Sequence, residues 1–485
     1  MTLDKEGGRV PGCPCRDDQK TQVEALCHRE LGMKTRKTRL AINGLLVLLF
    51  SAAPAGVLAQ EYGLDDLYRM ALGTAEKIKI SEENIQIAEA GKGKALSYLL
   101  PRVTTFAGVT AFTESKYSET KNIGAIPFPG SLIQPNTAAT WGVRLDESLS
   151  LGGREFTSFK MSRENVEKNR LDNDAMKEDY LLVVAFAYYH VLKAGKNLEI
   201  AEANVERLSA YRAAADKRFR IGEVTRTVLL RAEAELSGAL SERMTFKNSL
   251  ELAMTHLKRV VGISGEVQLK KETPAGRDGI RTVDASRALA LSERSDLKGL
   301  EIQKKQAEAQ VRFAKAAHWP SLSLSGVYSG TDQSPATSTI NRESIYAGAA
   351  LNFPLFEGGL RQAEVKEALS KEKQSGFLYE DLKKSIEMEV QAAYLDLITQ
   401  KATLKYLEDQ LVFAKDNYRA VARQFEFGLA HSIDVMDANT LLVSAERKVA
   451  DAGYNYQMTA LRMKKATGVL LKEILAKNEP NLGEE

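Results

Sequence analysis

Two carboxylates stand at a break in a long helical pattern. Asp434 and Asp437 follow the segment FEFGLAHS at residues 425–432, where a helical repeat stops at Gly428 and then resumes. Residues three apart lie on one face of a helix, so the two carboxylates would point the same way. A local interpretation is that Ser432 caps the resumed helix, that Asp434 complements the helix dipole and that Asp437 is only solvated. Any further role depends on the elements that hold this break.

No other set of residues predicts catalytic chemistry. After residue 59 the chain has four histidines, and none forms an i,i+4 pair or an H-E-x-x-H motif. The chain also lacks a P-loop and a G-x-S-x-G motif, so any energy must come from a partner. We therefore expect no enzyme activity, no cofactor and no metal site. The four histidines are His190, His256, His318 and His431.

The first 59 residues resemble an export signal in composition. A basic run follows Met33, the apolar stretch AINGLLVLLFSAAPAG comes next, and small residues at 57 and 59 fit a secretory cleavage site. We expect residues 1–59 to be an N-terminal extension and a cleaved signal peptide, with the true start at Met33. The alternative is a membrane anchor, for which the apolar run is short. No later segment approaches 18 apolar residues, so a membrane-crossing part of the remaining chain must be built from strands.

Removing this leader changes the charge balance. Residues 1–59 hold nine of the 67 basic and six of the 64 acidic side chains, so 58 of each sign remain. A neutral chain has no electrostatic motive to bind nucleic acid. The cysteines, Cys13, Cys15 and Cys27, all precede Met33, so the exported chain has neither a disulfide framework nor a catalytic thiol.

The chain contains an internal repeat with a constant spacing of 206 residues. Upstream, Pro101 and Pro320 are 219 residues apart, so the first repeat carries 13 extra residues between its proline and its double glycine. An insertion confined to one interval predicts a surface loop. The glycine pairs that keep the 206-residue spacing are Gly152 and Gly358, Gly222 and Gly428, and Gly262 and Gly468.

Each repeat predicts one very long helix, over residues 153–219 and 359–425, followed by a turn at 219–226 and 425–432. Apolar residues recur in alternating steps of three and four, which is a heptad pattern. In the first repeat Arg212 alone breaks it. Helices of about 65 residues are about 100 Å long and must pack side by side into a bundle, fibre or tube. The second-repeat pattern is Leu404, Leu407, Leu411, Ala414, Tyr418, Val421 and Phe425.

Four segments near residues 101–117, 139–151, 320–331 and 344–356 alternate between apolar and small or polar residues. Strands of about ten residues with this alternation suit a lipid-facing barrel, although a small soluble sheet is the alternative. Four strands cannot close on themselves, because single-chain barrels begin at eight. Open edges in lipid would leave backbone groups unpaired, so copies of the chain must associate. Trp141, Trp319, Tyr328 and Tyr346 would anchor such strands at the membrane interface, or else pack in a core.

The order and spacing of these landmarks resemble the TolC-like outer-membrane efflux proteins over about residues 60–475. The resemblance implies a mainly α fold with a small β part, divided into repeat 1 (60–285), repeat 2 (286–475) and a tail (476–485). Long antiparallel helices would form a periplasmic α-barrel, and a homotrimer would build a 12-stranded barrel in outer-membrane lipid. An inner-membrane pump and a periplasmic adaptor would feed it. The landmarks are Pro101 and Pro320, the double glycines Gly152-Gly153 and Gly358-Gly359, and the turns with Phe219 and Gly222 or Phe425 and Gly428.

The resemblance also implies a role for the opening segment. In the family the far helix ends form the periplasmic constriction, with an aromatic residue, a glycine three residues on, and aspartates nine and twelve residues on. Phe425, Gly428, Asp434 and Asp437 fit this spacing. Three copies would place six carboxylates around a narrow opening, which would favour cations and bind multivalent metal ions.

Two departures from the family affect how such an opening is held closed. The family often has tyrosine where Phe425 stands and arginine where Ala430 stands, and both help to hold the closed state. Here the lock must be different or weaker. The first turn offers Thr225 and Arg226. Arg226 is a candidate replacement cation, and the favoured alternative is a solvated arginine at the start of a helix. Val228 occupies the position equivalent to Asp434, so the first turn lacks that carboxylate.

The leading hypothesis is a passive exit duct of a tripartite export system in the outer membrane. The alternative is an exported coiled-coil scaffold without conduction, and a periplasmic enzyme comes third. The cargo is not specified by the residues, and drugs, metal ions and polypeptides all stay open.

Overall fold

The fold is that of a computed structural model, which describes residues 61–119, 121–123, 126–128, 130–265, 267–270, 281–336 and 341–478. The expected signal peptide, the start at Met33 and the three cysteines lie outside the described residues. Helix α9 (Leu470–Asn478) includes the first three positions of the tail expected over 476–485, and the rest of that tail lies outside the described residues.

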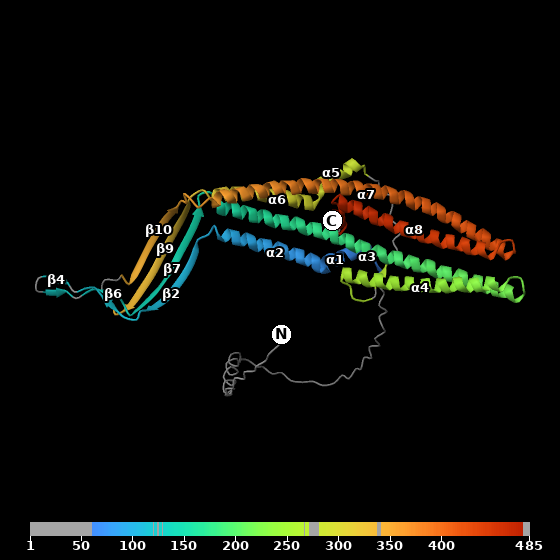
Figure 1. Ribbon diagram of the computed structural model, residues 1–485, viewed down its shortest axis with the longest axis horizontal. Coiled ribbons are helices and arrows are strands. Elements are labelled where there is room, and N and C mark those ends of the chain that lie inside the picture. The colour runs from blue at the N-terminus through green and yellow to red at the C-terminus, as the bar shows by residue number, and fades with distance from the viewer. Residues whose placement is uncertain are drawn as a thin grey trace, which may run out of the picture. The chain divides into compact units, whose positions relative to one another are not determined.

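Two helices of 67 residues each run through the two repeats, α3 (Arg154–Arg220) and α7 (Leu360–Glu426). At 1.5 Å per residue each is about 100 Å long. Each begins one residue later than the expected 153 and 359, because the glycine there is an N-cap in the left-handed region. The chain then returns along α4 (Arg226–Val261) and α8 (Ser432–Ala466), so each repeat ends in a long helical hairpin (Figure 1).

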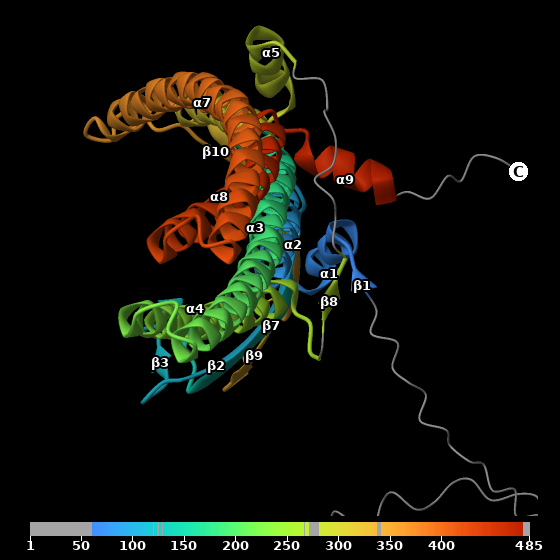
Figure 2. The ribbon, with the colours of Figure 1, turned by 90° about the vertical axis from the view of Figure 1, so that its right-hand side faces the viewer.

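Shorter helices pack beside these hairpins. Helix α2 (Glu76–Ser97) lies along α3, α6 (Ser295–Ala316) contacts both α3 and α7, and α8 lies against α3. Helices α1 (Leu64–Thr74) and α9 pack on α3, and α5 (Val283–Glu293) packs on α7. Figure 2 shows α1, α5 and α9 on one side of the row formed by the long helices. A two-stranded parallel pair, β1 (Glu61–Tyr62) and β8 (Gln268–Leu269), accompanies them.

The four main strands form one antiparallel sheet in the order β10-β9-β7-β2. They are β2 (Arg102–Ala111), β7 (Thr137–Ser150), β9 (Ser321–Ser334) and β10 (Glu343–Asn352). Among the described strands, β2 and β10 are the edges of this sheet. Strand β10 stops short of the expected 356, since Pro354 has no N–H to donate.

The strand expected over 101–117 is divided in two. The chain bends after Phe112, and β3 (Lys116–Tyr117) pairs with β6 (Leu132–Gln134) rather than with β7. Strands β4 (Lys121–Ile123) and β5 (Ile126–Phe128) pair with each other within the same insertion. In Figure 1 this insertion extends beyond the end of the four-stranded sheet, so the extra residues of the first repeat form an excursion from its rim.

The register places most of the apolar residues of the four strands on one face, while Phe106 and Val327 lie on the other. Leu145 pairs with Val103, Val143 with Tyr328, and directly paired residues share a face. Eight large apolar side chains of this face are exposed in the single chain. They are Val103, Val109, Trp141, Val143, Leu145, Leu324, Ile345 and Leu351, and their exposed fractions range from 41% for Val143 to 81% for Ile345.

Of the aromatic residues expected at a membrane interface, two pack against each other and two are largely exposed. Trp141 meets Tyr328 edge to face, with ring centroids 5.6 Å apart. Trp319 and Tyr346 are both more than half exposed. Among the described residues, no helix is long and apolar enough to serve as a membrane span.

The main hydrophobic core surrounds the middle of α3. There Leu181, Val184 and Tyr188 pack with residues of α1, α4 and α9. The heptad seam of α7 is buried or half-buried throughout. Arg212, which broke the pattern in α3, forms an ion pair with Glu233 of α4 at 2.8 Å. Arg212 therefore contacts α4, the other helix of its hairpin, through an ion pair instead of an apolar contact.

Candidate functional site

The two hairpin tips are built on one turn geometry. Gly222 and Gly428 follow the ends of α3 and α7 with φ of 80° and 74°, which only glycine adopts without strain. In the second tip the Gly428 N–H donates to the Phe425 carbonyl at 3.0 Å, and the next N–H donates to Gln424 at 2.8 Å. The first tip repeats both bonds at Phe219 and Arg218. These bonds satisfy carbonyls that a helix end leaves unpaired.

Asp434 caps the helix that follows the second turn. The N-cap residue is His431, and its backbone N–H donates to Asp434 Oδ2 at 2.8 Å. Ser432 is therefore not the cap, because the helix begins at that residue itself. Asp434 and Asp437 are both exposed, and Asp437 makes no hydrogen bond or ion pair with the other described residues. The structure thus gives Asp434 a local task and leaves the Asp437 carboxylate available.

Phe425 is the packing centre of the second tip. Its side chain is 7% exposed and packs in a cluster of residues from α3, α4, α7 and α8. The Tyr211 ring lies 5.3 Å from it, and the Arg218 guanidinium lies 4.8 Å from the ring centroid. Phe219, the equivalent residue of the first tip, is 38% exposed. The aromatic residue of the second tip therefore joins the two hairpins, whereas that of the first does not.

Two polar contacts accompany this packing. Arg218 Nη1 donates to the Phe425 carbonyl at 3.0 Å, while its Nε pairs with Glu223 at 2.9 Å. The Tyr211 hydroxyl donates to Ser432 Oγ at 2.7 Å. Burial raises the pKa of Tyr211, so its hydroxyl keeps the donated proton at neutral pH. Both contacts join α3 of the first hairpin to the second hairpin.

The cation that contacts the second tip is Arg218, whereas Arg226 matches the alternative of a solvated arginine at a helix start. Arg226 is exposed, forms no ion pair within the described residues, and follows Thr225, the N-cap of α4. Sequence analysis missed Arg218 and Tyr211, although their spacing of seven residues places them on one face of the helix. That spacing was the signal that could have found them.

Further contacts hold the hairpins together above the tip. Asn439 of α8 donates to Asn204 Oδ1 of α3 at 2.9 Å, and both side chains are buried. Arg207 pairs with Glu446 at 3.2 Å, also between α3 and α8. A buried polar pair must keep its partner, so the Asn204–Asn439 bond fixes the register of α8 against α3.

The junctions between strands and long helices are close-packed in the first repeat. A Cβ at Gly152 would lie 2.6 Å from the carbonyl oxygen of Ala316, so only glycine fits at the end of α6. The Pro320 carbonyl accepts the Leu151 N–H at 3.0 Å, which joins the two repeats at this point. Gly153, Gly358 and Gly359 all have positive φ, and Pro101 stands just before β2.

A buried charge cluster joins both repeats to α9. Arg294, between α5 and α6, is 7% exposed and pairs with Asp296 at 2.6 Å and with Glu389 of α7. Glu178 of α3 is 8% exposed, and its Oε1 accepts the N–H of Leu470 at the start of α9 at 3.1 Å. Burial raises the pKa of Glu178 to about 7 against the opposing effect of those backbone hydrogen bonds. Lys465 of α8 completes the cluster by pairing with Asp179 at 3.2 Å.

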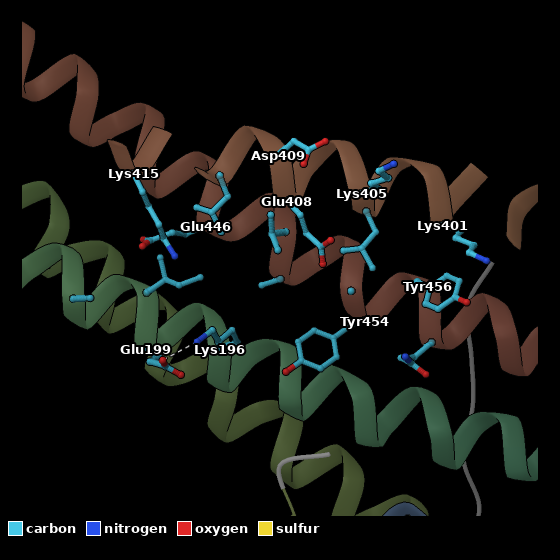
Figure 3. Close-up of a pocket in the computed structure, with 18 residues that line it drawn as sticks. Lys196, Glu199, Lys401, Lys405, Glu408, Asp409, Lys415, Glu446, Tyr454 and Tyr456 are labelled. Carbon is cyan, nitrogen blue, oxygen red and sulfur yellow. Dashed lines mark hydrogen bonds and ion pairs between the residues drawn. The ribbon is translucent and has the colours of Figure 1, made fainter. Parts of the chain in front are cut away.

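A groove of about 1120 Å³ is lined by α3, α7 and α8 (Figure 3). Lysines and acidic residues alternate along it, and Lys196 pairs with Glu199 at 2.7 Å. Tyr454 and Tyr456 add aromatic surface to it. Within the described ranges, no cluster of three or more His, Cys, Asp or Glu side chains could hold a metal ion.

Each repeat thus contributes one long helical hairpin and two strands of one open sheet. The family model described as "Outer membrane efflux protein" matches residues 67–263 and 287–469, one span in each repeat. The chain belongs to this family, whose members are transport channels of the outer membrane with a large periplasmic helical part.

Individual relatives agree with this assignment. The outer membrane protein TolC of Vibrio cholerae is 26% identical over 313 residues, which cover 62% of this chain and 70% of that protein. TolC of Salmonella enteritidis is 24% identical over 461 residues, which cover 92% of this chain and 90% of TolC. The solved structure of the outer membrane protein VceC from Vibrio cholerae has a TM-score of 0.71 at 17% identity, covering 84% of this chain and 96% of VceC. A structure of CusC has a TM-score of 0.73 at 18% identity, covering 85% of this chain and 95% of CusC.

Proposed function

We propose that three copies of the chain assemble into a passive exit duct across the outer membrane. The observation that carries this proposal is the open sheet, whose apolar face spans all four strands and whose edges, β2 and β10, are unpaired among the described strands. Unpaired backbone groups in lipid cost several kcal/mol each. Pairing β2 of one copy with β10 of the next would satisfy both edges and yield a closed barrel.

The helical hairpins would then form the periplasmic tunnel, with the tips at its narrow end. Asp434 and Asp437 from three copies would supply six carboxylates at that opening. In each copy, the Arg218–Phe425 and Tyr211–Ser432 contacts hold the second hairpin against the first. Opening requires the α7–α8 tip to move away from α3, which breaks both contacts. These two contacts would therefore serve as the lock, in place of the tyrosine and arginine that the family often has at 425 and 430.

The partners follow from the same arrangement. A periplasmic adaptor and an inner-membrane pump would supply the energy and the choice of cargo. Relatives include an alkaline protease secretion protein and a cation efflux system protein, so homologous chains serve different cargoes. We propose no enzyme activity and no resident cofactor for this chain.

Conductance of the purified protein in planar bilayers tests the duct and its mouth together. We expect stable channels that a trivalent cation blocks from the side of the tips, and block weakened about tenfold or more by Asp434→Asn combined with Asp437→Asn. Asp381→Asn, on the exposed surface of α7 away from the tip, is the matched control and should leave the block unchanged. A chain that stays in water without detergent and never conducts would instead support the scaffold alternative.

A further inference from the structure

We propose that a cavity between α3, α7 and α8 binds aromatic monoanions, one for each copy of the chain. The cavity has a volume of about 370 Å³, which suits a ligand with one or two fused rings. The residues that line it include Phe186, Tyr189, Asp396, Tyr454, Met458 and Arg462. It is separate from the hairpin tips, and it shares only Tyr454 with the groove of Figure 3.

Phe186 and His190 line the cavity from the side of α3 that is turned away from the main core, whereas Tyr189 and Met458 lie at the border with that core. Val184 and Tyr188 of α3 are buried in that core, together with residues of α1 and α9. Phe186 and His190 each follow one of them by two residues, so they point to the opposite side of the helix. The cavity is therefore on the side of the wall that α1 and α9 do not cover. In the proposed duct this is the side that passing cargo would meet.

Aromatic rings provide the apolar surface of the cavity. The Tyr189 and Tyr454 rings are 6.3 Å apart with an angle of 48° between their planes, and Met458 is 7% exposed. The Phe186 ring carries the Arg462 guanidinium at 4.8 Å from its centroid. A flat ring that enters beside these residues gains both stacking and sulfur–aromatic contact.

Arg462 provides the charge that selects an anion. Two other arginines that lie over rings are already engaged, Arg218 with Glu223 and Arg447 with Glu242. Arg462 makes no hydrogen bond or ion pair with the described residues, so the edge of its guanidinium can receive a carboxylate in two parallel hydrogen bonds. Lys193, which also lines the cavity, is held by Asp451 at 3.1 Å.

One acidic side chain limits the charge of the ligand. Asp396 of α7 lines the same cavity and has no hydrogen bond or ion pair within the described part of the chain. A second negative charge on the ligand would meet this carboxylate across a small, partly desolvated space. The site therefore favours a single anionic group attached to an aromatic ring.

The repeat shows that these residues are not requirements of the fold. At the positions 206 residues away, Ala392 stands for Phe186, Leu395 for Tyr189 and His256 for Arg462. The same long helices thus form without the two rings and without the cation. The aromatic and cationic lining is particular to the place where α3 meets α8, which gives one site per chain.

Calorimetric titration of the full-length, detergent-solubilised protein with 2-naphthoate tests the site directly. We expect saturable binding with one ligand per chain, weakened about tenfold or more by Arg462→Gln and several-fold by Phe186→Leu. Naphthalene-2-methanol, which lacks the charge, and cyclohexanecarboxylate, which lacks the aromatic ring, should bind at least about tenfold more weakly. Arg419→Gln, an exposed arginine paired with Asp416, is the matched control and should bind like the parent protein.

Three results would overturn the site. They are no saturable binding of 2-naphthoate, equal affinity in the Arg462→Gln variant whose helical circular dichroism is unchanged, or equal affinity for the uncharged alcohol. Binding to the purified protein needs no conduction, so loss of the duct proposal would leave this result standing, and the reverse also holds.

Discussion

The two hairpin tips have the same backbone conformation but differ in the side chains that contact the other hairpin. Both turns use a glycine at positive φ and the same pair of terminal hydrogen bonds. Phe425 is nearly buried against the other hairpin, whereas Phe219 is 38% exposed. The residues common to both repeats thus determine the turn. The residues that differ between the repeats determine which tip packs against the other hairpin.

The charges of the tips differ in the same way. By the 206-residue spacing, Arg231 of the first hairpin stands where the second has Asp437, and Val228 stands where it has Asp434. Arg218, which reaches the second tip, has Gln424 as its counterpart. The first tip is therefore basic and contacts the second hairpin through Arg218. The second tip is acidic and would line an opening.

A second contrast lies at the junctions between the short helices. In the first repeat Gly262 packs on Thr74, whose hydroxyl donates to the Val261 carbonyl at 2.7 Å. In the second repeat the equivalent Gly468 packs on Arg294, at the centre of the buried charge cluster. A hydroxyl hydrogen bond stabilises one junction and ion pairs stabilise the other. We therefore expect different solution conditions to destabilise the two junctions.

Arg294→Ala should have the largest effect on stability. It leaves Glu389 and Asp296 without their buried cation, which should lower the free energy of unfolding by about 3–5 kcal/mol. Denaturant unfolding of the detergent-purified protein measures this effect. Arg419→Ala, in an exposed ion pair, should change it by less than about 1 kcal/mol. Similar losses in both variants would show that the Arg294 cluster stabilises its junction no more than an exposed ion pair does.

Phe425→Ala and Phe219→Ala compare the tips directly. The first should cost about 3 kcal/mol, because it empties a packed cluster, and the second less than about 1 kcal/mol, because Phe219 is 38% exposed. The same unfolding assay gives both numbers. Equal costs would mean that the two tips are energetically equivalent.

The Glu178 carboxyl makes the second-repeat junction sensitive to pH. Its pKa is raised to about 7 in the folded chain, above the usual 4.5, so the folded state holds a proton that the unfolded state releases. The resulting stabilisation is full below about pH 4.5 and is lost as the pH rises through 7, by about 2–3 kcal/mol at most. Glu178→Gln should flatten this part of the stability profile. An unchanged slope in the variant would contradict the assignment.

Tyr211→Phe and Arg218→Gln should loosen the lock with a smaller energetic effect. Each removes one contact between the hairpins, worth about 1–2 kcal/mol. We expect faster hydrogen exchange at the α7–α8 tip and a larger single-channel conductance, with no change at the sheet. Tyr406→Phe, an exposed tyrosine of α7, serves as the control. Unaltered hydrogen exchange at the tip in both variants would show that these contacts do not stabilise the α7–α8 tip against α3.

Asp434→Asn should have the smallest effect on stability, about 0.5–1 kcal/mol, because its carboxylate caps α8. Asp437→Asn should cost almost nothing, since Asp437 is exposed. Thermal unfolding separates the two variants, while cation block should respond to both. If Asp437→Asn alone destabilised the chain as much, its carboxylate would have a structural partner.

Much of the architecture follows from the sequence for physical reasons. Heptad spacing and the absence of proline predict the long helices, and constant glycine spacing predicts the two repeats. Alternation predicts the four strands, although not the bend after Phe112, which depends on an insertion that pairs with itself. The cap at His431 was misplaced by one residue, because a short polar residue, Ser432, stood beside it.

The lock is the part that sequence reasoning could not reach. Arg218 and Tyr211 lie more than 200 residues from the groups they contact, and only the packing of α3 against the second hairpin brings them together. The charge cluster around Arg294 also depends on packing, because Glu389 on α7 lies 95 residues away in the sequence. Local patterns predict elements, whereas these contacts depend on how the elements are placed.

Cross-linking between the open edges of the sheet tests the central claim most directly. Thr105→Cys on β2 and Ala347→Cys on β10, with Cys13, Cys15 and Cys27 replaced by serine, place one thiol on each edge. Two strands separate these edges within a copy, about 14 Å, so a disulfide can form only between copies. With Thr105→Cys scanned against neighbouring β10 positions, we predict linked species of two and three chains and none larger. Only single chains throughout the scan, or a ladder that continues beyond three, would contradict the account.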